Sequence, residues 1–121
     1  MRIVLRNPLL GKRYPGEGHE VLAVVDTGYE GFVAVPNDVF VSLSFGELQL
    51  ETRRLVLANG AVLEAKGAYG AFEAPLLSLE SDGFVETYDG LGEVLLGVEA
   101  LSRSKVLLDY CTRVLRIEPC R

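Results

Sequence analysis

The sequence predicts an all-β domain with a closed or barrel-like sheet and one or two short helices. The apolar runs are rich in valine and have the length of strands. Glycines and pairs such as Asn59-Gly60 separate these runs, as turn residues do. Only the segments after Pro36 and Gly97 have the pattern of short helices. With 121 residues, 49% of them hydrophobic, the chain can build one core, so we expect residues 1–121 to form a single domain.

In the first part of the chain, strands are expected over 2–5, 19–25 and 32–35. Glycine and proline are frequent in segment 7–18, which indicates a loop or a loose hairpin turn. A helix is expected to begin at Pro36 and to continue to about Leu43, with Asn37 as its cap.

In the second part, strands are expected over 53–58, 63–74, 76–79, 84–88 and 94–96, with a terminal hairpin of 106–110 and 114–117. Asn59-Gly60 lies between two apolar runs, which is a strong hairpin signal. Residues 81–83 are the expected turn of a second hairpin. A helix over 98–104 would turn Leu101 towards the core.

The charge pattern excludes some partners. The formal net charge is −5 and the basic residues are scattered, with Arg53-Arg54 the one adjacent arginine pair, so we expect no nucleic-acid partner. No apolar stretch approaches the ~20 residues of a membrane-spanning helix, so no membrane partner is expected. Arg6 interrupts the N-terminal apolar run, which lacks the long apolar region of a signal peptide. These features predict a cytoplasmic protein.

No cofactor or metal is expected. Cys111 and Cys120 fit free thiols in the cytoplasm, although a disulfide between them stays open. They are too few for a metal site, and His19 is isolated from them along the chain. Cys111 would need a base to act as a nucleophile, and nothing connects it to His19, the only histidine.

The strongest functional signal is the triplet Asp26-Thr27-Gly28, which directly follows the apolar run 21–25. A carboxylate at the end of a buried strand costs several kcal/mol unless it is paired or hydrogen-bonded. A threonine hydroxyl and a tight glycine turn can hold such a group in one position. By itself, the triplet also fits an ordinary turn whose aspartate caps the local backbone.

Two further motifs follow in the order and at the spacing of a known family. They are Leu57-Ala58-Asn59-Gly60 and the run 94–101, in which Val94-Leu95-Leu96-Gly97 leads into the predicted helix. With these motifs the chain resembles the retropepsin-like aspartic proteases, the single-domain relatives of pepsin, over about residues 21–117. The run from Glu30-Gly31-Phe32 to Pro36 is most similar to a branch of small, stand-alone prokaryotic members.

The resemblance implies a closed acid-protease barrel and an endopeptidase that works as a homodimer on peptide substrates. Asp26 would be the catalytic carboxylate, and Thr27 would hydrogen-bond across the dimer axis while Gly28 forms the turn. Because one chain has one such triplet, the two copies of Asp26 would meet at a two-fold axis and activate a water between them. The hairpin with Ala58, Asn59 and Gly60 would close over the substrate, and Leu95 would help to wall its pocket.

Tyr29 and Glu30 depart from the viral pattern, in which a small residue follows the triplet. Tyr29 either fills a substrate subsite or packs on the next strand, and Glu30 either hydrogen-bonds the substrate backbone or is solvated. Asn59-Gly60 also fits a plain type I′ turn, and Leu95 also fits the core. A second class of function therefore stays open, namely a catalytically weak or silent protease-like module for dimerisation or peptide binding.

Overall fold

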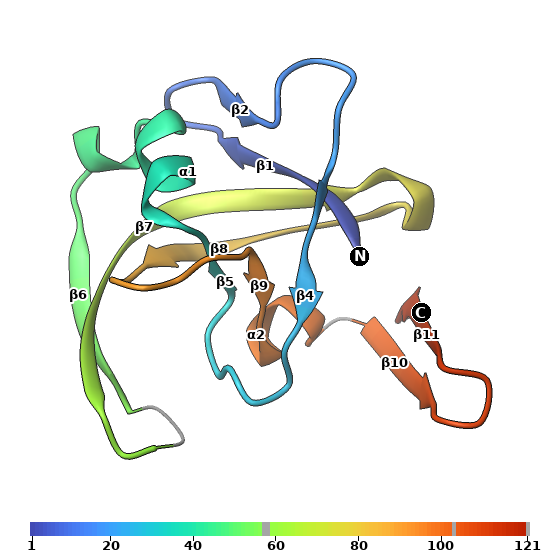
Figure 1. Ribbon diagram of the computed structural model, residues 1–121. Coiled ribbons are helices and arrows are strands. Elements are labelled where there is room, and N and C mark those ends of the chain that lie inside the picture. The colour runs from blue at the N-terminus through green and yellow to red at the C-terminus, as the bar shows by residue number, and fades with distance from the viewer. Residues whose placement is uncertain (57–58, 103, 121) are drawn as a thin grey trace.

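The computed structural model describes residues 1–56, 59–102 and 104–120, and it is mostly β (Figure 1). Within these ranges, nine strands form one sheet and two strands form another. The strands are β1 (Arg2–Asn7), β2 (Lys12–Tyr14), β3 (Val21–Leu22), β4 (Val24–Val25), β5 (Val33–Ala34), β6 (Glu51–Val56), β7 (Val62–Ala74), β8 (Leu79–Thr87), β9 (Leu95–Leu96), β10 (Ser104–Asp109) and β11 (Val114–Pro119). The helices are α1 (Asn37–Ser42) and α2 (Val98–Leu101), with 3-10 turns η1 (Phe45–Glu47) and η2 (Pro75–Leu77). The prediction of a β-rich chain with short helices is confirmed.

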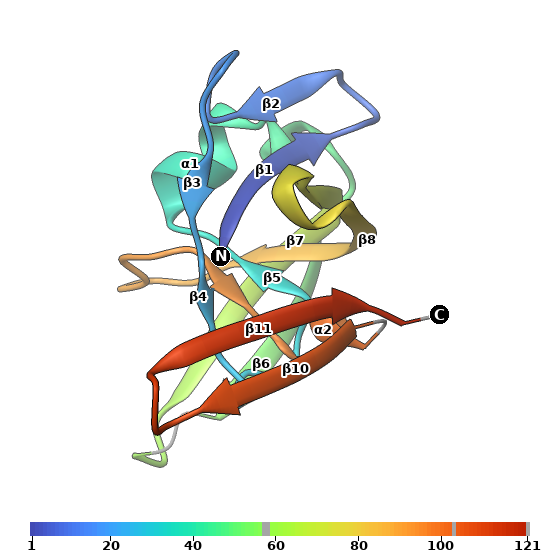
Figure 2. The ribbon, with the colours of Figure 1, turned by 90° about the vertical axis from the view of Figure 1, so that its right-hand side faces the viewer.

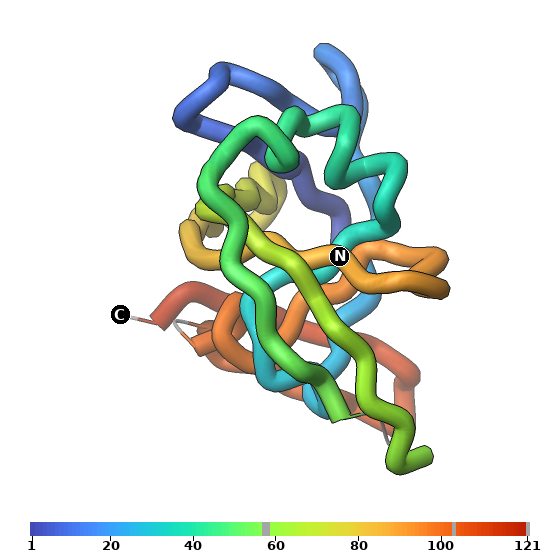
Figure 3. Tube along the Cα trace, turned by 90° about the vertical axis from the view of Figure 1, so that its left-hand side faces the viewer, coloured from blue at the N-terminus to red at the C-terminus, as the bar shows by residue number. Residues whose placement is uncertain are grey.

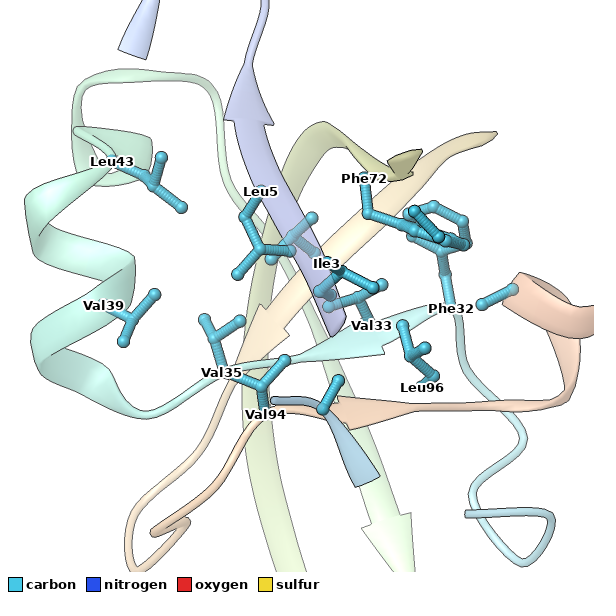
Figure 4. Close-up of a cluster of buried hydrophobic side chains, with 14 of the residues drawn as sticks. Ile3, Leu5, Phe32, Val33, Val35, Val39, Leu43, Phe72, Val94 and Leu96 are labelled. Atoms are coloured by element: carbon cyan, nitrogen blue, oxygen red, sulfur yellow. The ribbon is translucent and has the colours of Figure 1, made fainter. Parts of the chain in front are cut away.

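The large sheet has the strand order β2-β1-β7-β8-β5-β9-β4, with β3 beside β1 and β6 beside β7. It curls into a half-barrel around the core, as the view along the β6–β7 side shows (Figure 3). Side chains from β1, β5, β9 and α1 meet inside this curl (Figure 4). The rings of Phe32 and Phe72 pack against each other there in a tilted arrangement, with their centroids 5.5 Å apart. This packed interior supports β9 and the segment that leads out of β4.

The strand predicted over 19–25 is two short strands. β3 pairs with β1, whereas β4 pairs with β9. The change of partner occurs at Ala23, which is buried and whose amide donates to the carbonyl of Met1 at 2.7 Å. One apolar run therefore forms two strands that pair with different neighbours, β1 and β9. The alternation of apolar residues alone does not indicate such a change of partner.

The predicted hairpin around residues 81–83 is wrong. β8 runs unbroken from Leu79 to Thr87 and pairs along its whole length with β7, and the turn between them lies at η2 and Ser78. Gly83 has another reason to be glycine, because a Cβ there would lie 2.8 Å from Cγ of Phe32. It marks a close approach inside a strand rather than a turn.

The helices differ from the prediction at their ends. α1 has Pro36 as its N-cap residue and no side-chain cap, so the expected capping by Asn37 is wrong. α2 is shorter than the predicted 98–104, because β10 already begins at Ser104, while Leu101 faces the core as expected. Segment 7–18 contains β2, which forms a hairpin with β1.

The terminal hairpin β10–β11 is confirmed, and it forms a separate sheet to one side of the main sheet (Figure 1). It faces the viewer in Figure 2. Cys111 is in its turn and Cys120 follows its last strand, so the two exposed, free thiols lie at opposite ends of the hairpin. In the described ranges, no helix is long and apolar enough to cross a membrane.

Candidate functional site

The fold brings the two widely separated motifs of the sequence together. β9 pairs in parallel with β4, with Val24 opposite Leu95 and Val25 opposite Leu96. The other edge of β9 pairs with β5, so β9 lies between the two strands that the Asp26 loop connects. The amide of Asp26 donates to the carbonyl of Leu96 at 2.9 Å. The Asp26 loop and the Gly97 turn are therefore neighbours.

Gly97 fits closely beneath this loop. A Cβ at Gly97 would collide with the carbonyl oxygen of Gly31 and would lie 2.7 Å from both the carbonyl oxygen and Cδ2 of Tyr29. The next amide, that of Val98, donates to the carbonyl of Tyr29 at 2.9 Å. The glycine of the Leu-Leu-Gly motif is thus needed because two backbone segments approach each other here.

The carboxyl group of Asp26 is held by its own loop. Asp26 Oδ1 accepts a hydrogen bond from the amide of Gly28 at 2.9 Å. The backbone carbonyl of Asp26 accepts one from the amide of Tyr29 at 3.2 Å. Asp26 is half-buried, whereas Thr27 and Gly28 are exposed. The tight turn fixes the carboxyl group and leaves it accessible from outside the chain.

A groove of about 550 Å³ opens at this carboxyl group, and we call it the Asp26 groove. One side is the Asp26 loop, and the other is the β6 arm of the β6–β7 hairpin, which extends beside the loop (Figures 1 and 3). The lining residues are Asp26, Gly28, Tyr29, Glu30, Arg53, Arg54, Leu55, Val56, Tyr88 and Leu95. The groove is lined by both charged and apolar side chains, as ligand-binding grooves commonly are.

An ionic cluster centred on the buried Glu86 adjoins the groove, since Tyr29 and Arg53 line the groove itself. Glu86 on β8 is only 5% exposed, and it accepts hydrogen bonds from Arg53 through both carboxylate oxygens. The hydroxyl of Tyr29 also donates to Glu86. Burial, followed by the hydrogen bond to Glu86, raises the pKa of Tyr29 far above its ordinary value, and the same carboxylate raises the pKa of Arg53. The cluster holds its charges in place and keeps the tyrosine protonated.

A second groove of about 300 Å³ adjoins the first, and both are lined by Glu30 and Arg53. Glu51 and Glu99 also line it, beside Phe32 and Phe84. In the part of the chain that the structure describes, no three His, Cys, Asp or Glu side chains are grouped as metal ligands.

The structure gathers most of the predicted site residues at one place. Asp26, Gly28, Tyr29, Glu30 and Leu95 all line the Asp26 groove, and Thr27 is in the same loop. The side chain of Tyr29 also packs inward, because it is buried and bonded to Glu86.

The hairpin residues predicted to close over a substrate lie at the exposed end of the β6–β7 hairpin. The amide of Ala61 donates to Asn59 Oδ1 at 2.9 Å, and Gly60 has φ +83°. Val56 pairs with Val62, so the connection is longer than the two-residue turn that Asn-Gly favours. Ala58, also predicted to bind substrate, lies outside the described residues.

The sequence did not indicate that residues of β6 line the Asp26 groove, or that residues of β8 belong to the site. Arg53 and Arg54 stood out as the one adjacent arginine pair, but no partner for them could be inferred. In the predicted strand 84–88, Glu86 lies between Phe84 and Tyr88 on one face, and a charge on such a face indicates a partner. Tyr88 lines the groove together with Asp26, and burial, followed by the negative charge of Asp26, raises the pKa of Tyr88.

Comparison with known proteins gives one informative relative. The chain is 48% identical over 120 residues to a protein of Archaeoglobus fulgidus described as "Uncharacterized protein", and the match covers 99% of this chain and 93% of that protein. No protein-family model matches the chain, and neither does a solved structure. Identity at this level over nearly all of both proteins shows that the chain belongs to the same family as the Archaeoglobus fulgidus protein.

Proposed function

We propose that the protein is a retropepsin-like aspartic endopeptidase of the cytoplasm, built on a closed acid-protease barrel and active as a homodimer. The observation that carries the proposal is the position of β9 between β4 and β5, which puts the Asp26 loop beside the Leu-Leu-Gly turn at the base of a groove. The Asp26 triplet and the Leu-Leu-Gly motif have to be neighbours in the fold if they act together, as the resemblance to the family implies.

The chemistry requires a second carboxyl group. The described lining of the groove contains one aspartate, Asp26. In a two-fold dimer, the partner's Asp26 would face it. Two carboxyl groups at such a short distance share one proton, because they cannot both ionise easily. The ionised group takes a proton from a water, the water attacks the peptide carbonyl, and the protonated group hydrogen-bonds the developing oxyanion. The hydrogen bond from Gly28 would keep each carboxyl group in position.

The terminal hairpin supplies a candidate dimer surface. Leu108 and Leu115 lie opposite each other on β10 and β11, and they are 48% and 38% exposed. Val106 lies on the same face and is 36% exposed. Leu107 and Val114 on the opposite face are exposed as well, at 56% and 45%, whereas Ile117 is buried against the core. A hairpin with so much exposed apolar surface is typical of a surface that another chain covers.

The experiment that tests the proposal is digestion of a diverse peptide library, followed by mass spectrometry from acidic to neutral pH. Wild type and Asp26→Asn are compared, with Asp82→Asn as the matched control, because Asp82 is exposed and lines a different groove. The proposal expects cuts with wild type and Asp82→Asn that disappear with Asp26→Asn. Cuts that survive Asp26→Asn would overturn it.

A second function, a silent peptide-binding module, is favoured by one observation. Asp26 Oδ1 already caps its own turn through Gly28, which is a sufficient structural role for the side chain. A pepstatin-like transition-state mimic separates the two functions. An active peptidase binds it far more tightly than a matched plain peptide, whereas a binding module does not.

A further inference from the structure

We infer that Arg53, Glu86 and Tyr29 are positioning residues that tie the β6 arm to the Asp26 loop and thereby set the width of the Asp26 groove. We call these three residues the latch. This inference rests on the proposed function, because it assigns the latch to the reaction at Asp26.

The latch joins three separate elements at one carboxylate. Glu86 belongs to β8, Arg53 to β6, and Tyr29 to the loop after β4. Arg53 Nη2 donates to Glu86 Oε2 at 2.8 Å, Arg53 Nε donates to Oε1, and the Tyr29 hydroxyl donates to Oε2. A planar guanidinium that holds both oxygens of a carboxylate fixes orientation as well as distance.

Apart from its pairing with β7, the β6 arm has few contacts that would fix its position beside the groove. β6 pairs only with β7 among the described strands, and its other edge faces away from the sheet. Its residues are mostly exposed. The side chain of Arg53 therefore provides the polar connection from this arm to the body of the fold, and Glu86 provides its buried end.

Tyr29 links the Arg53–Glu86 pair to the loop that contains Asp26. Its hydroxyl binds Glu86, while its amide donates to the carbonyl of Asp26 at 3.2 Å and its carbonyl accepts from Val98 at 2.9 Å. A Cβ added at Gly31 would lie 2.5 Å from Tyr29 Cζ and 2.6 Å from Arg53 Nη2, so the latch also packs directly on the loop backbone. A shift of Arg53 would thus be transmitted to the loop that holds the carboxyl group.

The latch is distinguishable from a merely structural ion pair. Arg6 and Glu73 form a comparable Arg–Glu pair between β1 and β7, and Arg6 has the same exposed fraction as Arg53, 43%. That pair lines neither the Asp26 groove nor the groove beside it. Arg6→Gln is therefore a matched control for Arg53→Gln.

The first experiment is hydrogen–deuterium exchange of the full-length chain without substrate. Wild type, Arg53→Gln, Tyr29→Phe, the double variant and Arg6→Gln are compared. We expect Arg53→Gln to raise exchange about tenfold both in residues 51–56 and in the loop 27–30, which is far from them in the sequence. Tyr29→Phe should raise exchange in the same two segments. The double variant should add little to either single variant, because both act through Glu86.

Arg6→Gln should leave both segments unchanged. Additive effects, with Arg53→Gln confined to β6 and Tyr29→Phe confined to the loop, would overturn the inference. Tyr29→Phe removes a single oxygen, so it keeps the test informative if Arg53→Gln weakens the fold as a whole.

The second experiment measures kinetics with a peptide that wild type cleaves. Tyr29→Phe should lower kcat about tenfold with KM nearly unchanged, since it misplaces the loop rather than removing a substrate contact. Arg53→Lys, which keeps the charge but not the paired hydrogen bonds, should be intermediate between wild type and Arg53→Gln. Equal kcat in wild type and Tyr29→Phe would overturn the role in the reaction. If wild type cleaves nothing, the proposed function fails, whereas the exchange experiment still decides the latch.

Discussion

The amide of Asp26 donates a hydrogen bond to the carbonyl of Leu96 at 2.9 Å. This bond continues the parallel pairing of β4 with β9 by one residue beyond Val25. The carboxyl-bearing loop therefore starts at a fixed point of the sheet. Its far end is fixed as well, because Gly97 donates to the carbonyl of Phe32 at 2.9 Å. A short strand inserted between two others thus holds both ends of the loop.

Replacing Gly97 with alanine should destabilise the fold. The added Cβ would meet backbone atoms of Gly31 and Tyr29, which cannot move aside as the end of a side chain can. We expect a loss of ~1–3 kcal/mol in the free energy of unfolding, measured by urea denaturation. Gly92→Ala is the matched control, because a Cβ there meets nothing within 4 Å. Equal stability of the two variants would contradict the close approach at Gly97.

The sequence predicted where strands and helices occur better than it predicted which strands and side chains contact each other. The Asp26 triplet and the Gly97 turn could be identified from apolar runs that end in special residues. The Arg53–Glu86 pair could not, because the two residues are 33 positions apart in the chain and belong to strands that are not paired with each other. Gly83 was misassigned for a related reason, since a glycine needed for contact with Phe32 and a glycine needed for a turn look alike in the sequence.

The stability of the protein should depend on Tyr29 at alkaline pH. Burial, together with the hydrogen bond to Glu86, raises the pKa of Tyr29 in the folded state above its ordinary value of about 10. The stabilisation is complete below the unfolded-state pKa and is lost as the pH rises towards the folded-state pKa.

We therefore compare the free energy of unfolding of wild type and Tyr29→Phe from pH 8 to about pH 11. Above about pH 10, the difference between the two should shift against wild type by as much as ~1.4 kcal/mol per pH unit. Parallel curves across this range would show that Tyr29 is not held protonated by the fold.

The terminal hairpin should control assembly. Leu108→Glu places a charge on the exposed apolar face that we assign to the dimer, so the proposed function expects a shift from dimer to monomer in sedimentation velocity at micromolar protein. Val41→Glu is the control, because Val41 is 65% exposed on α1, away from this hairpin. A dimer that survives Leu108→Glu would exclude this face as the interface.

The most direct test of the account is a subunit-mixing titration, because its central claim is that two copies of Asp26 act together. Wild type is mixed with Asp26→Asn in increasing proportion, the chains are allowed to exchange, and peptide cleavage is measured at constant total protein. If both carboxyl groups are needed, activity follows the square of the wild-type fraction, since only dimers of two wild-type chains cleave. Activity that falls in direct proportion to the wild-type fraction would mean that one Asp26 suffices, and it would contradict the shared site.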